Sequence, residues 1–163
     1  MDVLIGNICS LLAMITDSVG STQKTARRVL IWQSVSQVIY CVSTLILRGY
    51  SATVQNGVSL LRNLTAIRGK QPKWAEYILI SLGVGLGIVF NNLGLWGFLP
   101  IIGNLVYSVA VFRFQENERA LKTTFLFCVA AFFVFNAVIL NFVGVISNIV
   151  IFATTLISLL KKR

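Results

Sequence analysis

The sequence predicts an all-helical integral membrane protein with seven transmembrane helices, and two observations support this prediction. Of the 163 residues, 56% are hydrophobic and only 12% are charged, whereas about a quarter of the residues of a soluble domain are charged. The chain also contains seven apolar segments close to the roughly 20 residues that a helix needs to cross the hydrocarbon layer. They cover residues 3–18, 29–47, 50–67, 75–93, 95–112, 122–140 and 142–160.

The pattern within these segments favours helices over strands. Backbone groups without partners are too costly in lipid for any spanning structure other than a helix or a closed barrel. Runs such as FLFCVAAFFVFNAVIL lack the period-two alternation of barrel strands. We therefore expect each segment to be a helix.

The basic residues predict the orientation of the chain. A net charge of +9 would suggest a nucleic-acid partner for a soluble protein, but here the cations lie in short connections between apolar runs, where they act as topology signals. One side has a single cation, Arg48, and the other has twelve: Lys24, Arg27, Arg28, Arg68, Lys70, Lys73, Arg113, Arg119, Lys122, Lys161, Lys162 and Arg163. The positive-inside rule predicts that this second side is cytoplasmic, with the N-terminus outside and the C-terminus inside.

An Asn recurs near the outer third of the first, third, fifth and seventh predicted helices. The stretches are IGNICSLLAMIT around Asn7, VQNGVSLLRNLT around Asn56, IGNLVYSVAVFR around Asn104 and ISNIVIFATTLI around Asn148. Asn104 follows Asn7 by 97 residues, and Asn148 follows Asn56 by 92 residues. We interpret this spacing as two parallel repeats of three helices, an arrangement known from transporters with a site near the bilayer midplane.

Parallel repeats of three helices need one extra crossing between them, because three crossings end on the opposite side of the membrane. The fourth helix supplies it. The predicted organisation is 3+1+3, with a first triple-helix bundle at residues 1–70, a connector helix at 71–94 and a second bundle at 95–163.

The four Asn residues have two alternative explanations. Asn56 and Asn148 lie seven residues beyond the turns that Gly49 and Asn141 begin, about 10 Å deeper at the helical rise per residue. An amide at that depth must find a partner. Each of the four either bonds a neighbouring helix or faces a central cavity and binds a polar, uncharged ligand.

Further polar residues point in the same direction. Gln33, Gln37 and Tyr40 form one polar stripe on the 29–47 helix and are expected to face the bundle interior. Asn136 is the corresponding candidate among the Phe residues of the 122–140 segment. Together with Asn7, Asn56, Asn104 and Asn148, these residues form the predicted substrate site.

Arg62 lies in the inner half of the 50–67 helix. Its side chain either extends to the cytoplasmic headgroups or contacts an anionic group of a substrate or lipid. We expect no carboxylate at a comparable depth. Asp17 and Glu76 lie near the cytoplasmic ends of their helices and are possible partners there.

The absence of His and of acidic residues near the bilayer centre argues against an enzyme, because the usual acid–base groups, metal ligands and activated nucleophiles are missing. We predict no catalytic residue, no metal and no cofactor. Gly83 and Gly87 form a GxxxG pair, which is typical of close helix packing.

Two stretches resemble the YgjV-type family of small bacterial inner-membrane proteins. They are ARRVLIWQSVSQVIY…GYSATVQNGVSLLRNL and WGFLPIIGNLVYSVAVFR, followed by the Phe-rich helix with Asn136. This resemblance implies a bacterial inner (cytoplasmic) membrane location and no established biochemical function. It also implies kinship with the wider seven-helix group of SWEET-type sugar facilitators, PnuC-type vitamin facilitators and the KDEL receptor.

In the sugar facilitators of that group, paired Asn residues on the third and seventh helices bind the substrate, and Asn56 and Asn148 match these positions. The Pro-Gln signature of the group is missing, because Pro100 is followed by Ile101 and the first helix has no Pro. The resemblance therefore implies the fold and the Asn pair but not the gating mechanism.

We therefore predict a facilitative transporter of a small polar metabolite, such as a vitamin, a nucleoside or a sugar-like molecule. The alternative is a non-transporting receptor, lipid-binding protein or assembly partner with the same fold. The expected partners are the lipid bilayer and a small polar solute, with no nucleic acid, and a homo-oligomer is left open.

Overall fold

The computed structural model describes residues 1–21, 26–67, 73–113 and 118–161. These residues form seven α-helices and one short 3-10 helix, η1, and contain no strand, as predicted. The helices are α1 Asp2–Ser21, α2 Ala26–Ile46, α3 Tyr50–Ile67, α4 Lys73–Val89, η1 Gly94–Gly97, α5 Phe98–Arg113, α6 Glu118–Val138 and α7 Phe142–Lys161. The main difference from the predicted segments is that α4 ends earlier, and η1 precedes α5.

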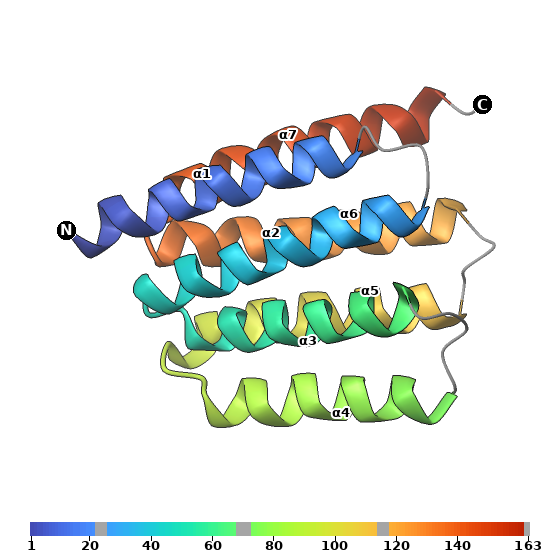
Figure 1. Cartoon of the computed structure of the whole chain (residues 1–163), viewed down its shortest axis with the longest axis horizontal. Helices are drawn as coiled ribbons and strands as arrows, with labels where there is room; N and C mark the ends of the chain where they lie inside the picture. Colours follow the sequence, from blue (N-terminus) through green and yellow to red (C-terminus); the bar gives the residue numbers. More distant parts are fainter. Residues whose placement is uncertain (22–25, 68–72, 114–117, 162–163) are drawn as a thin grey trace.

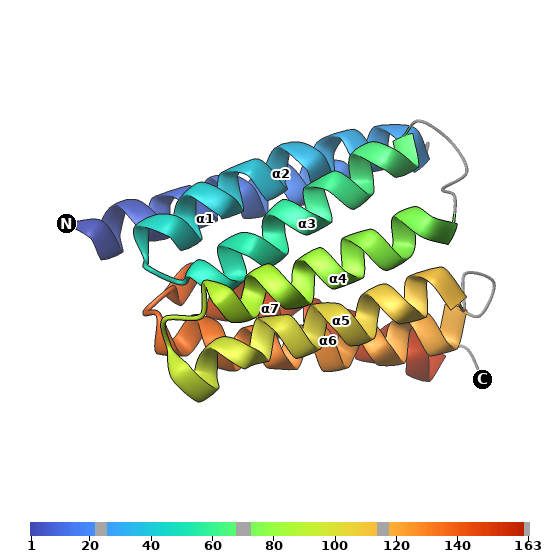
Figure 2. The same cartoon turned by 90° about the horizontal axis from the view of Figure 1, so that it is seen from below.

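The helices lie in two layers, and consecutive helices run in opposite directions (Figure 1). In the first layer α2 packs against both α1 and α3, and in the second α6 packs against both α5 and α7. The layers meet where α1 contacts α7 and where α3 contacts α5. These six helices therefore form a closed ring, and α4 packs outside it against α3 and α5 (Figure 2).

The polarity of the ring is the reverse of that of a soluble protein. Large apolar side chains such as Leu4, Leu12 and Ile146 are exposed on its outer surface, whereas Ser43 and Gln55 are almost fully buried. Polar groups that are buried need hydrogen-bond partners, and here neighbouring helices provide many of them. The outer surface is suited to lipid.

The α1–α2 contact shows how small residues bring these helices together. A Cβ on Gly6 would lie 2.5 Å from Cγ of Leu47, so no larger residue fits there without movement. One turn deeper, Ser43 Oγ donates to the carbonyl oxygen of Gly6 at 2.8 Å and shares a 2.7 Å hydrogen bond with Ser10 Oγ. These hydrogen bonds satisfy the buried hydroxyl groups and link α1 to α2.

The α2–α3 and α6–α7 turns have the same backbone geometry. Arg48 and Leu140, 92 residues apart, both have φ of 57°, in the left-handed region that few residues other than Gly adopt. The next amide in each turn bonds back into the preceding helix, from Gly49 to the Thr44 carbonyl at 2.8 Å and from Asn141 to the Asn136 carbonyl at 2.9 Å. The turns thus repeat at the 92-residue spacing that separates Asn56 from Asn148.

An apolar cluster fills the ring at the end where these turns lie. Leu47 and Ala52 from the first layer pack with Phe135 and Ile139 from the second, and Phe135 is fully buried. This cluster joins the two layers next to the turns.

One helix, Asp2–Val19, has both the length and the apolar composition to cross a membrane by itself among the described residues. Shorter apolar helices are found at Leu30–Ile46, Trp74–Val89, Gly94–Ala110, Thr123–Val138 and Phe142–Ile157. The prediction of seven helices is therefore confirmed, and one of them clearly meets the length and composition criterion for crossing a membrane.

Candidate functional site

A cavity of about 200 Å³ lies between the two layers and is lined by every helix of the ring. The first layer contributes Asp17, Gln37, Tyr40, Thr44, Asn56, Ser59 and Arg62. The second layer contributes Asn104, Tyr107, Phe125, Cys128, Val129, Phe132, Asn136, Asn141, Gly144, Ser147, Asn148 and Ile151. Amide, hydroxyl and charged groups therefore meet in one space inside an otherwise apolar protein.

The cavity contains the predicted Asn pair and two polar atoms that lack partners. Asn56 on α3 and Asn148 on α7 both line it. Within the described part of the chain, Nδ2 of Asn148 and Oε1 of Gln37 are buried and have no hydrogen-bond partner. An unsatisfied buried polar atom costs about 1–3 kcal/mol, so a hydrogen bond from a bound polar molecule to either atom would stabilise the folded chain.

Asn104 lines the cavity but also belongs to a hydrogen-bond chain that links three helices. Its Nδ2 donates to Oε1 of Gln55 at 2.7 Å, and Nε2 of Gln55 donates to the Gly83 carbonyl on α4 at 2.7 Å. Gln55 is 2% exposed. The amide of Gln55, next to Asn56 in the sequence, is thus the structural link between α3, α4 and α5.

The side-chain amides of Asn136 and Asn141, next to the α6–α7 turn, are hydrogen-bonded to each other. Nδ2 of Asn141 donates to Oδ1 of Asn136 at 3.2 Å, and Oδ1 of Asn141 accepts the backbone amide of Gly144 at 3.0 Å. The second bond satisfies a free amide in the first turn of α7, the usual function of an N-cap Asn. Asn136 therefore faces the cavity from a position that the start of α7 fixes.

Two of the predicted site residues do not line the cavity. Asn7 bonds the α6–α7 turn: its Nδ2 donates to the Leu140 carbonyl at 2.9 Å and its Oδ1 accepts the Val143 amide at 3.0 Å. Gln33 has an exposed side chain. Asn7 is therefore an interhelical contact, one of the two explanations that the sequence left open, and the polar stripe of α2 faces the cavity only through Gln37 and Tyr40.

Asn7 and Asn104 also lie at different depths, although each is near the start of its helix. Asn7 contacts Val143 in the first turn of α7, whereas Asn104 contacts Gln55 in the second turn of α3. In the second turn of α7, Ser147 contacts Met14 of α1, not Asn7. Asn104 is thus about one helical turn deeper than Asn7 relative to the opposite layer.

Arg62 points into the cavity and is held by α5. Its Nη1 donates to Ser108 Oγ at 3.1 Å, and its guanidinium lies 5.7 Å from the ring centroid of Tyr107, within the range of a cation–π contact. The Tyr107 ring in turn packs on Phe125, with centroids 5.1 Å apart. These contacts direct Arg62 across the ring, and not along α3 toward the headgroups.

Asp17 lines the same cavity, so the expectation that no carboxylate reaches the depth of Arg62 is wrong. Its carboxylate accepts a hydrogen bond from Ser36 of α2. Ser36 precedes Thr44 by eight residues, and Thr44 bonds Thr53 of α3, which runs in the opposite direction. The position eight residues after Thr53 is next to Arg62, so Asp17 and Arg62 lie at nearly the same depth. From the sequence, the depth of Asp17 was judged by its distance to the end of its helix. That distance does not show how far neighbouring helices are shifted along their axes relative to each other.

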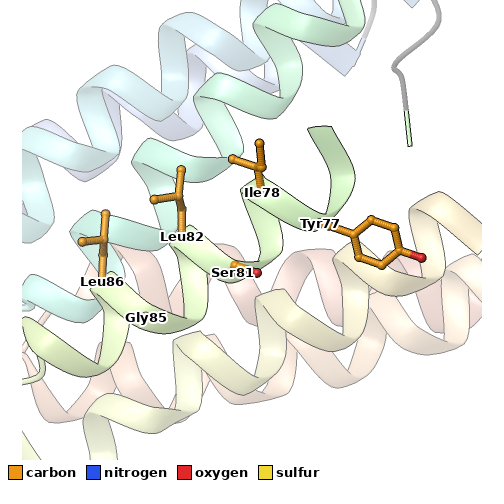
Figure 3. A pocket seen from close by; sticks show the side chains of 6 residues that line it. All are labelled: Tyr77, Ile78, Ser81, Leu82, Gly85 and Leu86. Atoms are coloured by element: carbon orange, nitrogen blue, oxygen red, sulfur yellow. The ribbon is translucent and has the colours of Figure 1, made fainter. Parts of the chain in front are cut away.

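Other hollows, besides the central cavity, lie on the outer surface of the described residues. One is a groove along α4, lined by Tyr77, Ile78, Ser81, Leu82, Gly85 and Leu86 (Figure 3). Its volume of about 420 Å³ exceeds that of the central cavity, but it belongs to one helix and has an almost wholly apolar lining, so it is a lipid-facing surface. Another, of about 320 Å³, lies between α6 and α7 and shares Val129 and Asn148 with the central cavity.

The described residues include no group of three or more His, Cys, Asp or Glu side chains that could hold a metal ion. The chemistry available in the cavity is therefore hydrogen bonding by amides and hydroxyls, one carboxylate, one guanidinium and aromatic rings. Such groups recognise a polar solute.

Comparison with known proteins identifies one family. The model of a family described as bacterial inner membrane protein, Imp-YgjV, matches residues 4–163. Neither the comparison with curated proteins nor that with solved structures found a match. The seven helices and the apolar outer surface are consistent with this match. The chain is a multi-pass protein and belongs to the YgjV family of bacterial inner membrane proteins.

Proposed function

We propose that this protein is a facilitative transporter of a small polar metabolite, such as a vitamin, a nucleoside or a sugar-like molecule, which binds between the two layers. The observation that carries the proposal is the central cavity, whose lining includes Gln37 and Asn148, each with a buried polar atom that has no hydrogen-bond partner among the described residues. Its volume of about 200 Å³ is below the range of roughly 300–1,000 Å³ typical of drug-sized ligands. The substrate is accordingly small.

The proposed architecture is 3+1+3, with two parallel repeats of three helices and α4 as the connector. The common geometry of the turns at Arg48 and Leu140 supports it, as does the matching packing of α2 and α6 in the middle of their layers. Parallel repeats form transporter sites at their interface, and the cavity lies between the two layers.

The proposed orientation has the N-terminus outside and the C-terminus in the cytoplasm. Arg28 in the first turn of α2, Arg113 at the end of α5 and Arg119 in the first turn of α6 are exposed. These three helix ends lie at the same end of the ring as the C-terminal end of α7 (Figure 1), and the positive-inside rule assigns such an end to the cytoplasm. Five of the other cations that predict this orientation lie outside the described residues: Lys24, Arg68, Lys70, Lys162 and Arg163.

The proposed chemistry is binding without reaction. Asn and Gln amides each offer both donors and acceptors, which suits a polar solute that is bound and released unchanged. We assign no catalytic role to any residue of the cavity, and no cofactor or metal.

Counterflow into proteoliposomes, with a panel of radiolabelled vitamins, nucleosides, sugars and amino acids, tests the proposal. We expect at least one solute to exchange, and the Asn56→Ala, Asn148→Ala double variant to reduce its flux about tenfold or more, because hydrogen bonds to buried groups are lost. Gln37→Ala should also reduce the flux. Gln33→Ala is the matched control one turn away on α2, and its flux should equal that of the wild type. Equal flux in the wild type and the double variant would remove the Asn pair from the site.

A second function, binding of a membrane lipid without transport, is favoured by the groove between α6 and α7. Because this groove shares Asn148 with the cavity, a lipid could place its acyl chain in the groove and its polar group at Asn148. Ala153→Trp fills the groove, which Ala153 lines, without changing a cavity residue. Loss of a co-purifying lipid in this variant, detected by native mass spectrometry, together with no flux in any variant, would favour lipid binding over transport.

A further inference from the structure

The deep part of the central cavity carries opposite charges on opposite walls. Asp17 is held on the α1–α2 wall by Ser36, and Arg62 is held on the α3–α5 wall by Ser108 and Tyr107. Both side chains line the cavity, and the helix contacts set them at nearly the same depth. The cavity therefore has a negative side and a positive side.

Hydrogen-bonding capacity follows the same division. On the negative side, Gln37 follows Ser36 in α2, and its Oε1 is buried without a partner among the described residues. A carboxylate and an amide oxygen only accept hydrogen bonds, so this side takes a donor. On the positive side, a guanidinium only donates, so that side takes an acceptor, and a carboxylate is the acceptor that also matches its charge.

The shape of the cavity limits the ligand further. A space of about 200 Å³ admits a compact molecule, and Tyr107 and Phe125 provide apolar surface beside the positive side. A neutral polar solute gains hydrogen bonds from the two charged groups but no charge–charge attraction, and a simple cation or anion is attracted to one charge and repelled by the other. A molecule with both charges is attracted at both ends.

We propose that the deep part of the cavity binds a small zwitterion, with its ammonium at Asp17 and Gln37 and its carboxylate at Arg62. This assignment rests on the proposed transport function only for the fate of the ligand. Binding itself requires the cavity alone. It narrows the substrate class from polar metabolites in general to compounds of amino-acid type.

The test is a binding cycle between ligand groups and protein groups, with the purified full chain in nanodiscs. The twenty common amino acids are screened by the ligand-dependent rise in melting temperature, and the tightest binder is compared with its methyl ester, which lacks the carboxylate, and its N-acetyl derivative, which lacks the ammonium. We expect each derivative to bind about tenfold to a hundredfold more weakly, the value of one charge-assisted hydrogen bond.

Two variants then assign each end of the ligand. Asp17→Asn keeps an acceptor for Ser36 and should weaken binding of the free amino acid about tenfold or more without changing that of the N-acetyl derivative. Arg62→Gln should weaken binding of the free amino acid to the same extent without changing binding of the methyl ester. Arg62→Lys should retain part of the affinity for the free amino acid. Glu76→Gln on α4 and Arg113→Gln, whose side chains do not line the cavity, are the charge-matched controls and should bind like the wild type.

The outcomes separate this inference from the proposed function. Equal affinity for the amino acid and both derivatives, or counterflow of neutral solutes with no binding of any amino acid, overturns the zwitterion site and leaves transport standing. Selective binding that depends on Asp17 and Arg62, with no counterflow of the bound amino acid, supports the site and rejects transport.

Discussion

The two seams where the layers meet are built differently. At the α3–α5 seam, Gln55 bonds both Asn104 and the Gly83 carbonyl, and α4 packs over both seam helices. At the α1–α7 seam, the described side-chain contacts are those of Asn7 with the α6–α7 turn and of Ser147 with Met14. One seam is thus fixed by a buried amide and a covering helix, while the other relies on contacts of two helices alone. We expect the α1–α7 seam to be the less stable of the two.

The largest expected effect comes from removing the amide of the α3–α5 seam. Gln55→Leu keeps the approximate volume but leaves Nδ2 of Asn104 and the Gly83 carbonyl without their present partner. We expect the free energy of unfolding to fall by about 2–4 kcal/mol, because two buried groups lose hydrogen bonds. Titration with SDS in mixed micelles, followed by circular dichroism, measures this loss. A change below about 1 kcal/mol, the level found for many membrane hydrogen bonds, would show that Gln55 does not stabilise the seam.

The glycines of α4 give a matched pair with a smaller expected effect. A Cβ on Gly87 would lie 2.7 Å from Nε2 of Gln55 and 2.9 Å from Cγ1 of Ile101, whereas a Cβ on Gly85 meets nothing within 4 Å. We expect Gly87→Ala to destabilise by about 1–3 kcal/mol through overpacking. Gly85→Ala should leave stability unchanged or raise it by up to about 1 kcal/mol through helix propensity. The same SDS titration compares them, and equal effects of the two substitutions would contradict close packing of α4 on the seam.

The smallest effect is expected at the α1–α7 seam. Asn7→Ala removes the bonds to Leu140 and Val143, and we expect a loss of about 1–2 kcal/mol, since each membrane hydrogen bond contributes around 0.6 kcal/mol on average. Thr154→Val on α7, where the hydroxyl bonds only its own helix, is the control and should cost less. A loss for Asn7→Ala larger than that for Gln55→Leu would reverse the order of the seams.

The helices could be predicted from the sequence because length and apolar composition determine them locally. The 92-residue spacing of Asn56 and Asn148 could also be read from the sequence. The same spacing separates Arg48 and Leu140, whose turns have the same backbone geometry. The GxxxG pair of Gly83 and Gly87 correctly predicted close packing, although its partner, Gln55, could not be identified. A side chain's partner depends on how helices rotate and shift against each other, which a single sequence does not encode locally.

The lining of the cavity was predictable in the same limited sense. Asn56, Asn148, Asn104, Asn136, Gln37 and Tyr40 all line the cavity. Asn7 and Gln33 are amides like the lining residues but do not line the cavity, because orientation around the helix axis is set by tertiary packing. Asp17 was considered only as a possible partner of Arg62 near a helix end, and Tyr107 was not named although Ser108 follows it directly in the sequence.

The joint presence of Asp17 and Arg62 in one cavity has an electrical consequence. Moving one elementary charge through a membrane potential of 100 mV changes its energy by about 2.3 kcal/mol. The formal charges of these two side chains cancel, and so do those of a zwitterion between them. If the walls move together during a transport cycle, no net charge crosses the field, and we expect the membrane voltage neither to drive nor to oppose the passage of the solute. Its concentration gradient would then set the direction of flow.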